Sequence, residues 1–302
     1  MVDAGDREGL YRACRLCPRE CGVDRTKAKG FCGMGDTVVA ARAAKHFWEE
    51  PCISGGDGRG TGAVFFSGCT LKCAFCQNMR ISREGWGREI SVRRLADIFK
   101  SLEDEGAHSL DLVTGTQFIP SILNALDLAK PKIPVVWNSG GYEKAETLRL
   151  LSGYVQVYLP DVKHVSARLS GLCAGAEDYF RHAKEALLEM RRQTGENVVG
   201  EDGILQRGML VRHLILPGCT TDSIAVLSFL HDTLPDVPVS IMRQYMPVPW
   251  CRIRGLDRKI TDREYERVLS AARALGIRGY MQEKESASES FVPAFDGEGI
   301  DD

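Results

Sequence analysis

Three cysteines, Cys69, Cys73 and Cys76, occur in a C-x3-C-x2-C arrangement directly after a short apolar run. A [4Fe–4S] cluster contains four irons, so three thiolates leave one iron open to a ligand from outside the chain. Zinc is a weaker alternative, because structural zinc prefers four protein ligands and no fourth ligand is apparent near this loop. The spacing therefore predicts a [4Fe–4S] cluster with one exchangeable position.

Four further cysteines, Cys14, Cys17, Cys21 and Cys32, form a second group with the spacing C-x2-C-x3-C-x10-C. Four thiolates close either a tetrahedral zinc site or a cysteine-only iron–sulfur cluster. A bound metal would stabilise a segment this short and poor in apolar residues. Zinc is slightly favoured, because a C-x2-C turn and two more thiolates satisfy a tetrahedral ion. Disulfides are the alternative for an exported protein.

Composition places the chain among ordinary globular proteins. It has 302 residues, of which 44% are hydrophobic, enough to bury a core without cross-links. The net charge of -2 gives no electrostatic reason to expect nucleic acid or a membrane surface as a partner. The polar start does not resemble a signal peptide, and no apolar run approaches the length of a membrane span. We therefore expect a cytoplasmic protein.

Short apolar runs alternate with amphipathic helical patterns over more than half of the chain. The strands are expected at residues 62–67, 109–113, 133–137, 154–159, 209–216, 237–243 and 278–282. This alternation indicates parallel βα units, which fit either a doubly wound sheet or a partial barrel.

Three regions follow from these patterns. Residues 1–60 form a cysteine-rich segment with little periodic structure, expected to be metal-bound. Residues 61–283 form the βα domain. Residues 284–302 form an acidic tail that we expect to be flexible.

The sequence around the first cysteine group, Phe65–Asn78, resembles the pyruvate formate-lyase-activating-enzyme-like branch of the radical S-adenosylmethionine (SAM) superfamily, and within it a poorly characterised group of activating-enzyme homologues. The resemblance covers about Trp48–Glu283. Further matching segments are Trp48–Pro51, Ile53–Gly55, Asn138–Tyr142, Tyr158–Lys163, Arg212–Gly218 and Gln244–Pro247. It implies a partial (β/α)6 TIM-like barrel with SAM at the carboxyl ends of the strands, beside the small cysteine-rich N-terminal segment.

The resemblance also implies the chemistry. The amino and carboxylate groups of SAM would occupy the open iron, and the reduced cluster would cleave SAM to a 5′-deoxyadenosyl radical that abstracts hydrogen. An electron donor such as flavodoxin or ferredoxin would supply the reducing electron.

Two strand ends are candidate SAM contacts by this resemblance. Members usually carry Gly-Gly-Glu after the second strand, where this chain departs from the pattern with Gly115, Thr116 and Gln117. The glycine would still allow close backbone approach, and either side chain could supply an oxygen acceptor. Asn138 and Ser139 follow the third strand and are expected to contact ribose or methionine. Ordinary turns are the alternative at both places.

Charged residues at two later strand ends complete the expected site. Asp161 and Lys163 are two apart on a strand and therefore point to the same face. The resemblance implies that Lys163 pairs with the SAM carboxylate and that Asp161 holds Lys163 or a cation. Arg212 suits bidentate carboxylate binding and is expected beside SAM. A plain surface ion pair is the alternative for Asp161 and Lys163.

Three functions remain open at this point. The first is an enzyme that activates a glycyl-radical partner protein, which rests on the resemblance. The second is a radical SAM enzyme that modifies a small molecule or another protein side chain, which the extra N-terminal cysteines favour. The third is a non-catalytic metal-binding interaction protein, which the charged strand ends disfavour.

Overall fold

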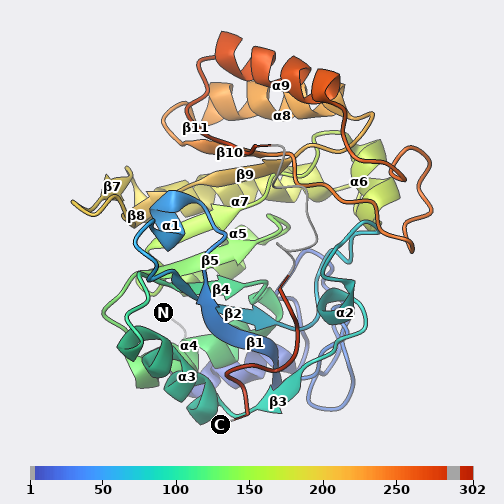
Figure 1. The fold of residues 1–302 in the computed structure, drawn as a ribbon. Helices are drawn as coiled ribbons and strands as arrows, with labels where there is room; N and C mark the ends of the chain where they lie inside the picture. The colour runs from blue at the N-terminus through green and yellow to red at the C-terminus, as the bar shows by residue number, and fades with distance from the viewer. Residues whose placement is uncertain (1–3, 284–292, 302) are drawn as a thin grey trace.

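The computed structural model describes residues 4–283 and 293–301. Parallel strands form a curved wall, and helices pack along its outer side (Figure 1). The strands of this wall are β2 (Thr61–Phe66), β4 (Leu110–Val113), β5 (Val135–Ser139), β6 (Val157–Pro160), β8 (Leu205–Met209), β9 (Val211–Leu214), β10 (Val239–Met242) and β11 (Gly279–Met281).

Two sheets make up the wall and join at β6. Strands β2, β4, β5, β6 and β8 are neighbours in the larger sheet, and β9, β10 and β11 form the smaller one. The chain passes from β8 directly into β9. Just after β6, the N–H of Val162 donates to the carbonyl of Arg212 in β9 over 2.8 Å. A parallel bridge between Asp161 and Arg212 completes the junction. The predicted partial TIM-like barrel is therefore confirmed.

Helices connect successive strands of the wall. The longer ones are α3 (Val92–Asp104), α4 (Ile119–Ala129), α7 (Tyr179–Thr194), α8 (Thr220–Thr233) and α9 (Asp262–Ala274). The shorter ones are η1 (Ala4–Tyr11), α1 (Pro51–Ser54), α2 (Met79–Ser82), η2 (Thr116–Phe118), α5 (Ala145–Leu148), η3 (Arg149–Leu151) and α6 (Ala167–Ala174). In the part of the chain that the structure describes, no helix has the length and apolar character needed to cross a membrane.

Local sequence explains where helices begin. The Ser91 hydroxyl accepts the N–H of Arg94 over 3.1 Å and caps α3. The predicted capping box of Thr261 and Glu264 is present at the start of α9. The seven predicted strands are all found, with ends that differ by a few residues, because apolar runs mark burial more sharply than they mark strand ends.

The prediction of little regular structure before residue 60 is wrong for β1 (Val38–His46). This strand runs antiparallel to β2, with Ala44 opposite Ala63, and carries β3 (Arg88–Ile90) on its other edge. Alanine has a low strand propensity, so the alanine-rich β1 gives a weak signal in the sequence. Its position covers the edge of β2 that the barrel leaves open.

The prediction of a flexible tail is wrong for residues 293–301. These residues run beside β1 and are joined to it by main-chain hydrogen bonds of 3.1 and 2.9 Å (Figure 1). Phe295 and Ile300 are buried. Their apolar burial offsets the entropy lost by ordering this short segment. The rest of the predicted tail lies outside the described residues.

Candidate active site

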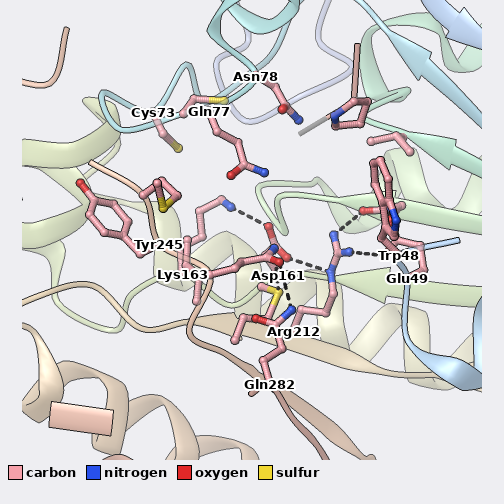
Figure 2. Close-up of a pocket in the computed structure, with 18 of the residues that line it drawn as sticks. Trp48, Glu49, Cys73, Gln77, Asn78, Asp161, Lys163, Arg212, Tyr245 and Gln282 are labelled. Carbon is pink, nitrogen blue, oxygen red and sulfur yellow. Dashed lines mark hydrogen bonds and ion pairs between the residues drawn. The ribbon is translucent and has the colours of Figure 1, made fainter. Parts of the chain in front are cut away.

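The C-x3-C-x2-C loop lies at the carboxyl end of β2. Cys73 and Cys76 line a cavity of about 220 Å³ into which the ends of the parallel strands open (Figure 2). Cys69 is half-buried and lies outside the residues that line this cavity. The N–H of Leu71 donates to Sγ of Cys69 over 3.4 Å, and the Ser82 hydroxyl donates to Sγ of Cys76 over 3.4 Å.

This loop fits an iron–sulfur cluster. Its donors are three soft thiols, and N–H and O–H groups point at two of the sulfurs, as they do around cluster thiolates. Burial raises the pKa of Cys73 to about 12 and also raises the pKa of Cys76. The positive charge of a bound metal core offsets the free-energy cost of burying deprotonated thiolates in this loop. Across residues 4–283 and 293–301, no three Cys, His, Asp or Glu side chains are arranged as around a single metal ion.

Lys163 and Asp161 point into the same cavity, as their spacing predicts. Lys163 Nζ lies 2.6 Å from Oδ2 of Asp161. Burial lowers the pKa of Lys163, but the negative charges of Asp161 and Cys73 outweigh this effect and raise the pKa above its ordinary value. Lys163 is therefore a permanent cation beside the cysteine loop.

The guanidinium of Arg212 is bound by three protein side chains and is not free for bidentate binding of a ligand carboxylate. Its Nε lies 3.2 Å from Asp161, its Nη1 lies 2.8 Å from Glu49, and its Nη2 donates to Oδ1 of Asn138 over 2.6 Å (Figure 2). Asn138 in turn donates to Oδ2 of Asp111 over 3.1 Å. Arg212, near the start of β9, thus connects this strand to the ends of β5 and β6, and its guanidinium is already occupied.

Three carboxyl groups in or beside this cavity were not predicted from the sequence. Glu49 and Glu50 line the cavity, and Asp111 is fully buried beside them. Burial and the charge of Glu49 raise the pKa of Asp111 well above its ordinary value. Two signals could have identified them: the acidic pair directly before Pro51, and the single acid inside the apolar run of β4.

The structure does not bring Gly115, Thr116 and Gln117 to the cavity wall. The Thr116 hydroxyl donates to Glu143 over 2.7 Å, and the Gln117 amide donates to main-chain carbonyls, including that of Ser67 over 2.9 Å. These hydrogen bonds fix η2 against neighbouring segments, whereas Oε1 of Gln117 is buried without a hydrogen-bond partner among the described residues. That they contact the cofactor stays a prediction from the resemblance.

Asn138 and Ser139 have different positions. Asn138 lines the cavity, whereas Ser139 is buried and its hydroxyl accepts the N–H of Gly141 over 3.3 Å. The contact of Ser139 with SAM stays a prediction from the resemblance. Aromatic side chains complete the wall, with the rings of Phe75 and Tyr245 edge to face at 6.1 Å.

The N-terminal cysteine group lies next to the first one. Cys14, Cys17 and Cys32 are buried, Cys21 is half-buried, and all eleven cysteines of the chain are free thiols. The N–H of Cys69 donates to the carbonyl of Cys32 over 3.3 Å. The two predicted cysteine sites therefore share a boundary in the folded chain.

This chain is similar to proteins that are already known. The family model described as "Radical SAM superfamily" matches residues 63–205. A protein of Methanocaldococcus jannaschii named "Uncharacterized protein MJ0674" is 28% identical over 278 residues, covering 88% of this chain and 75% of the other. The crystal structure of Streptococcus suis SuiB bound to S-adenosylmethionine aligns with a TM-score of 0.44 and 14% identity. That alignment covers 74% of this chain and about half (48%) of SuiB. Residues 63–205, which include the three-cysteine loop at the end of β2, are therefore similar to the radical SAM superfamily.

Proposed function

We propose that this protein is a radical SAM enzyme that cleaves SAM reductively and uses the product for hydrogen abstraction. The observation that carries the proposal is that Cys73, Cys76 and Lys163 line one cavity at the ends of the parallel strands. When bound there, a [4Fe–4S] cluster and SAM would supply a 5′-deoxyadenosyl radical. The chain would supply the ligands, the orientation and the exclusion of water.

Lys163 is the residue that we assign to the SAM carboxylate. It is cationic, it donates a hydrogen bond to Asp161 over 2.6 Å, and the charge of Cys73 acts on it. A carboxylate that approached the cysteine loop would meet this ammonium group first. Arg212 acts through Asp161, which it holds from the opposite side over 3.2 Å.

Aromatic side chains in the cavity wall limit the access of water. Phe65, Phe75 and Tyr245 are buried and face the same space as the charged strand ends. A reactive carbon radical abstracts hydrogen from any donor within reach, so a site that excludes stray donors protects the enzyme itself.

A protein substrate, such as a glycyl-radical partner, is one candidate for the hydrogen donor. Phe47 and Trp48 are 51% and 47% exposed beside the cavity, and Trp48 also lines it. Exposed aromatic side chains at a site entrance are typical of surfaces that bind other proteins. The alternative is a small molecule or another protein side chain. An electron donor such as flavodoxin or ferredoxin belongs to either proposal.

The test is anaerobic reconstitution with iron and sulfide, followed by reduction in the presence of SAM. We expect 5′-deoxyadenosine and methionine in equal amounts, with dithionite or reduced flavodoxin as the electron source. A reconstituted protein with an intact cluster that forms neither product would refute the proposal. Acceleration by a glycyl-radical protein, with a glycyl signal in electron paramagnetic resonance, would select the protein substrate over a small molecule.

A further inference from the structure

A long irregular segment follows η1 and buries several of its side chains. Residues 12–37 contain no helix and no strand. Nevertheless Cys14, Leu16, Cys32 and Met34 are each less than 10% exposed. A structureless stretch of this length within a compact protein usually has a function of its own or an additional cross-link.

Turns in this segment bring the cysteines together. Two main-chain hydrogen bonds close the first turn. The N–H of Cys14 donates to the carbonyl of Val23 over 3.0 Å, and the carbonyl of Cys14 accepts the N–H of Gly22 over 3.0 Å. This pairing places Sγ of Cys21 3.9 Å from the Cys14 carbonyl. A second turn then faces the first: a Cβ at Gly30 would lie 3.3 Å from Sγ of Cys21. A side chain at position 30 would enter the space beside the Cys21 thiol, and glycine leaves this space open.

Arg25 is a buried cation that has no carboxylate partner among residues 4–283 and 293–301. Its side chain is 2% exposed, and its described hydrogen bonds go to the carbonyls of Met34 (3.1 Å), Gln117 (2.5 Å) and Gly35. Its Nη1 also contacts Sγ of Cys14 over 3.8 Å, and its guanidinium lies over the rings of Tyr11 and Phe118, 4.8 and 5.7 Å from their centroids. Burying an uncompensated guanidinium is costly, so an anionic group is expected beside it. Four thiolates around a metal centre carry the required net negative charge.

The same segment is built onto the cysteine loop of the barrel. Cys32 accepts the N–H of Cys69, and a Cβ at Gly68 would lie 2.4 Å from Cγ of Met34. Arg19 donates from Nε to the carbonyl of Thr70 over 2.9 Å. Ordering of this segment therefore supports the loop on which the first cluster depends.

We propose that Cys14, Cys17, Cys21 and Cys32 bind a second metal centre through four thiolates, separate from the [4Fe–4S] cluster of the barrel. The ligand is a thiophilic metal, as one zinc ion or one iron–sulfur cluster. Arg25 offsets its charge from the Cys14 side. The thiols turn inward on binding, since no three of them already surround a single-ion position in the described structure.

Metal analysis of a full-length variant tests this proposal independently of SAM chemistry. In Cys69→Ala/Cys73→Ala/Cys76→Ala the barrel cluster is absent, so any remaining bound metal belongs elsewhere. After anaerobic reconstitution with zinc, or with iron and sulfide, we expect about one zinc or about four irons per chain. Either result supports the proposal and identifies the metal. A triple variant that retains neither metal after gel filtration overturns it.

Two further variants in the same background locate the metal. Adding Cys14→Ser and Cys32→Ser should abolish metal retention, whereas adding Cys52→Ser, which alters a buried cysteine outside both groups, should leave it unchanged. Retention of the metal without Cys14 and Cys32 would contradict the assignment.

Thiol alkylation of the wild-type chain covers the case in which the variants fail to fold. In the reconstituted protein the four cysteines should resist iodoacetamide, as read by mass spectrometry of peptides, and should react once a chelator or acid releases the metal. Equal reactivity before and after metal release would overturn the proposal.

Discussion

The main-chain N–H of Cys69 donates a hydrogen bond to the carbonyl oxygen of Cys32 over 3.3 Å. This bond joins the first cysteine of the barrel loop to the last cysteine of the N-terminal group. The sequence alone describes two unrelated cysteine patterns, and the fold places them side by side. The first cluster is therefore expected to respond to damage in the N-terminal segment as well as in its own loop.

Replacing any one cysteine of the barrel loop should abolish SAM cleavage. Cys69→Ala, Cys73→Ala and Cys76→Ala each remove one of the three thiolates that leave a single iron open. We expect 5′-deoxyadenosine formation to fall to the background of the assay. Cys173→Ala, in a buried cysteine outside both groups, is the control and should retain activity. A single loop variant that still forms product would disprove the ligand assignment.

Lys163→Met should weaken SAM binding without unfolding the barrel. The variant removes an ammonium group from the cavity wall, and a charge-assisted hydrogen bond of this kind contributes about 1.5–3 kcal/mol. The dissociation constant for SAM should therefore rise by about 10- to 150-fold. Anaerobic calorimetry of the reconstituted protein measures this change. Lys27→Met, at an exposed surface lysine, should leave the affinity unaltered; equal affinities in all three proteins would return Lys163 to a purely structural role.

Arg212→Met should lower stability more than it lowers SAM affinity. The variant removes the arginine partner of Glu49 and leaves Asp161 with Lys163 alone, and breaking a buried pair typically costs about 3–5 kcal/mol. Urea unfolding under anaerobic conditions reads this loss. Arg273→Met breaks an exposed pair with Glu266 and should cost at most about 1 kcal/mol. Unchanged stability together with weak SAM binding would instead support the sequence-based prediction that Arg212 binds the SAM carboxylate.

Glu143 should make stability fall as the pH rises from about 4.5 to about 7. Burial raises the pKa of Glu143 to about 7 from an ordinary value of 4.5, although Thr116 donates to it. Within this pH window the native state keeps a proton that the unfolded state has lost, so the free energy of unfolding decreases with pH. Below the window both states are protonated, and above it both are ionised. The loss is on the order of 3 kcal/mol, since one pKa unit corresponds to about 1.36 kcal/mol.

Glu143→Gln isolates this contribution from other titrating groups. The amide keeps the shape of the side chain but does not ionise. The variant should therefore gain stability relative to wild type at pH 8 and show little difference at pH 4. A difference between the two proteins that stays constant across this range would show that Glu143 does not titrate as described.

The sequence by itself determined the parts of this protein that local chemistry controls. The C-x3-C-x2-C spacing places three thiols on one short loop wherever that loop lies. Apolar runs located the strands, because burial on both faces of a parallel sheet demands continuous apolar residues. The two-residue spacing predicts that Asp161 and Lys163 share a face; in the structure both follow the end of β6, and they meet through their ion pair of 2.6 Å. The capping box at Thr261 begins a helix without help from distant residues.

Only the tertiary structure decided which polar groups meet. Arg212 and Glu49 are 163 residues apart in the chain, yet their ion pair occupies the guanidinium that sequence reasoning left free for SAM. The amide N–H groups of Gln117 donate to main-chain carbonyls. Arg25 donates to the Gln117 carbonyl, although the two residues are 92 positions apart in the chain. Such pairings depend on which strand ends become neighbours. Residue spacing specifies a side chain's face, but the curvature of the sheet and the packing of distant segments select its partners.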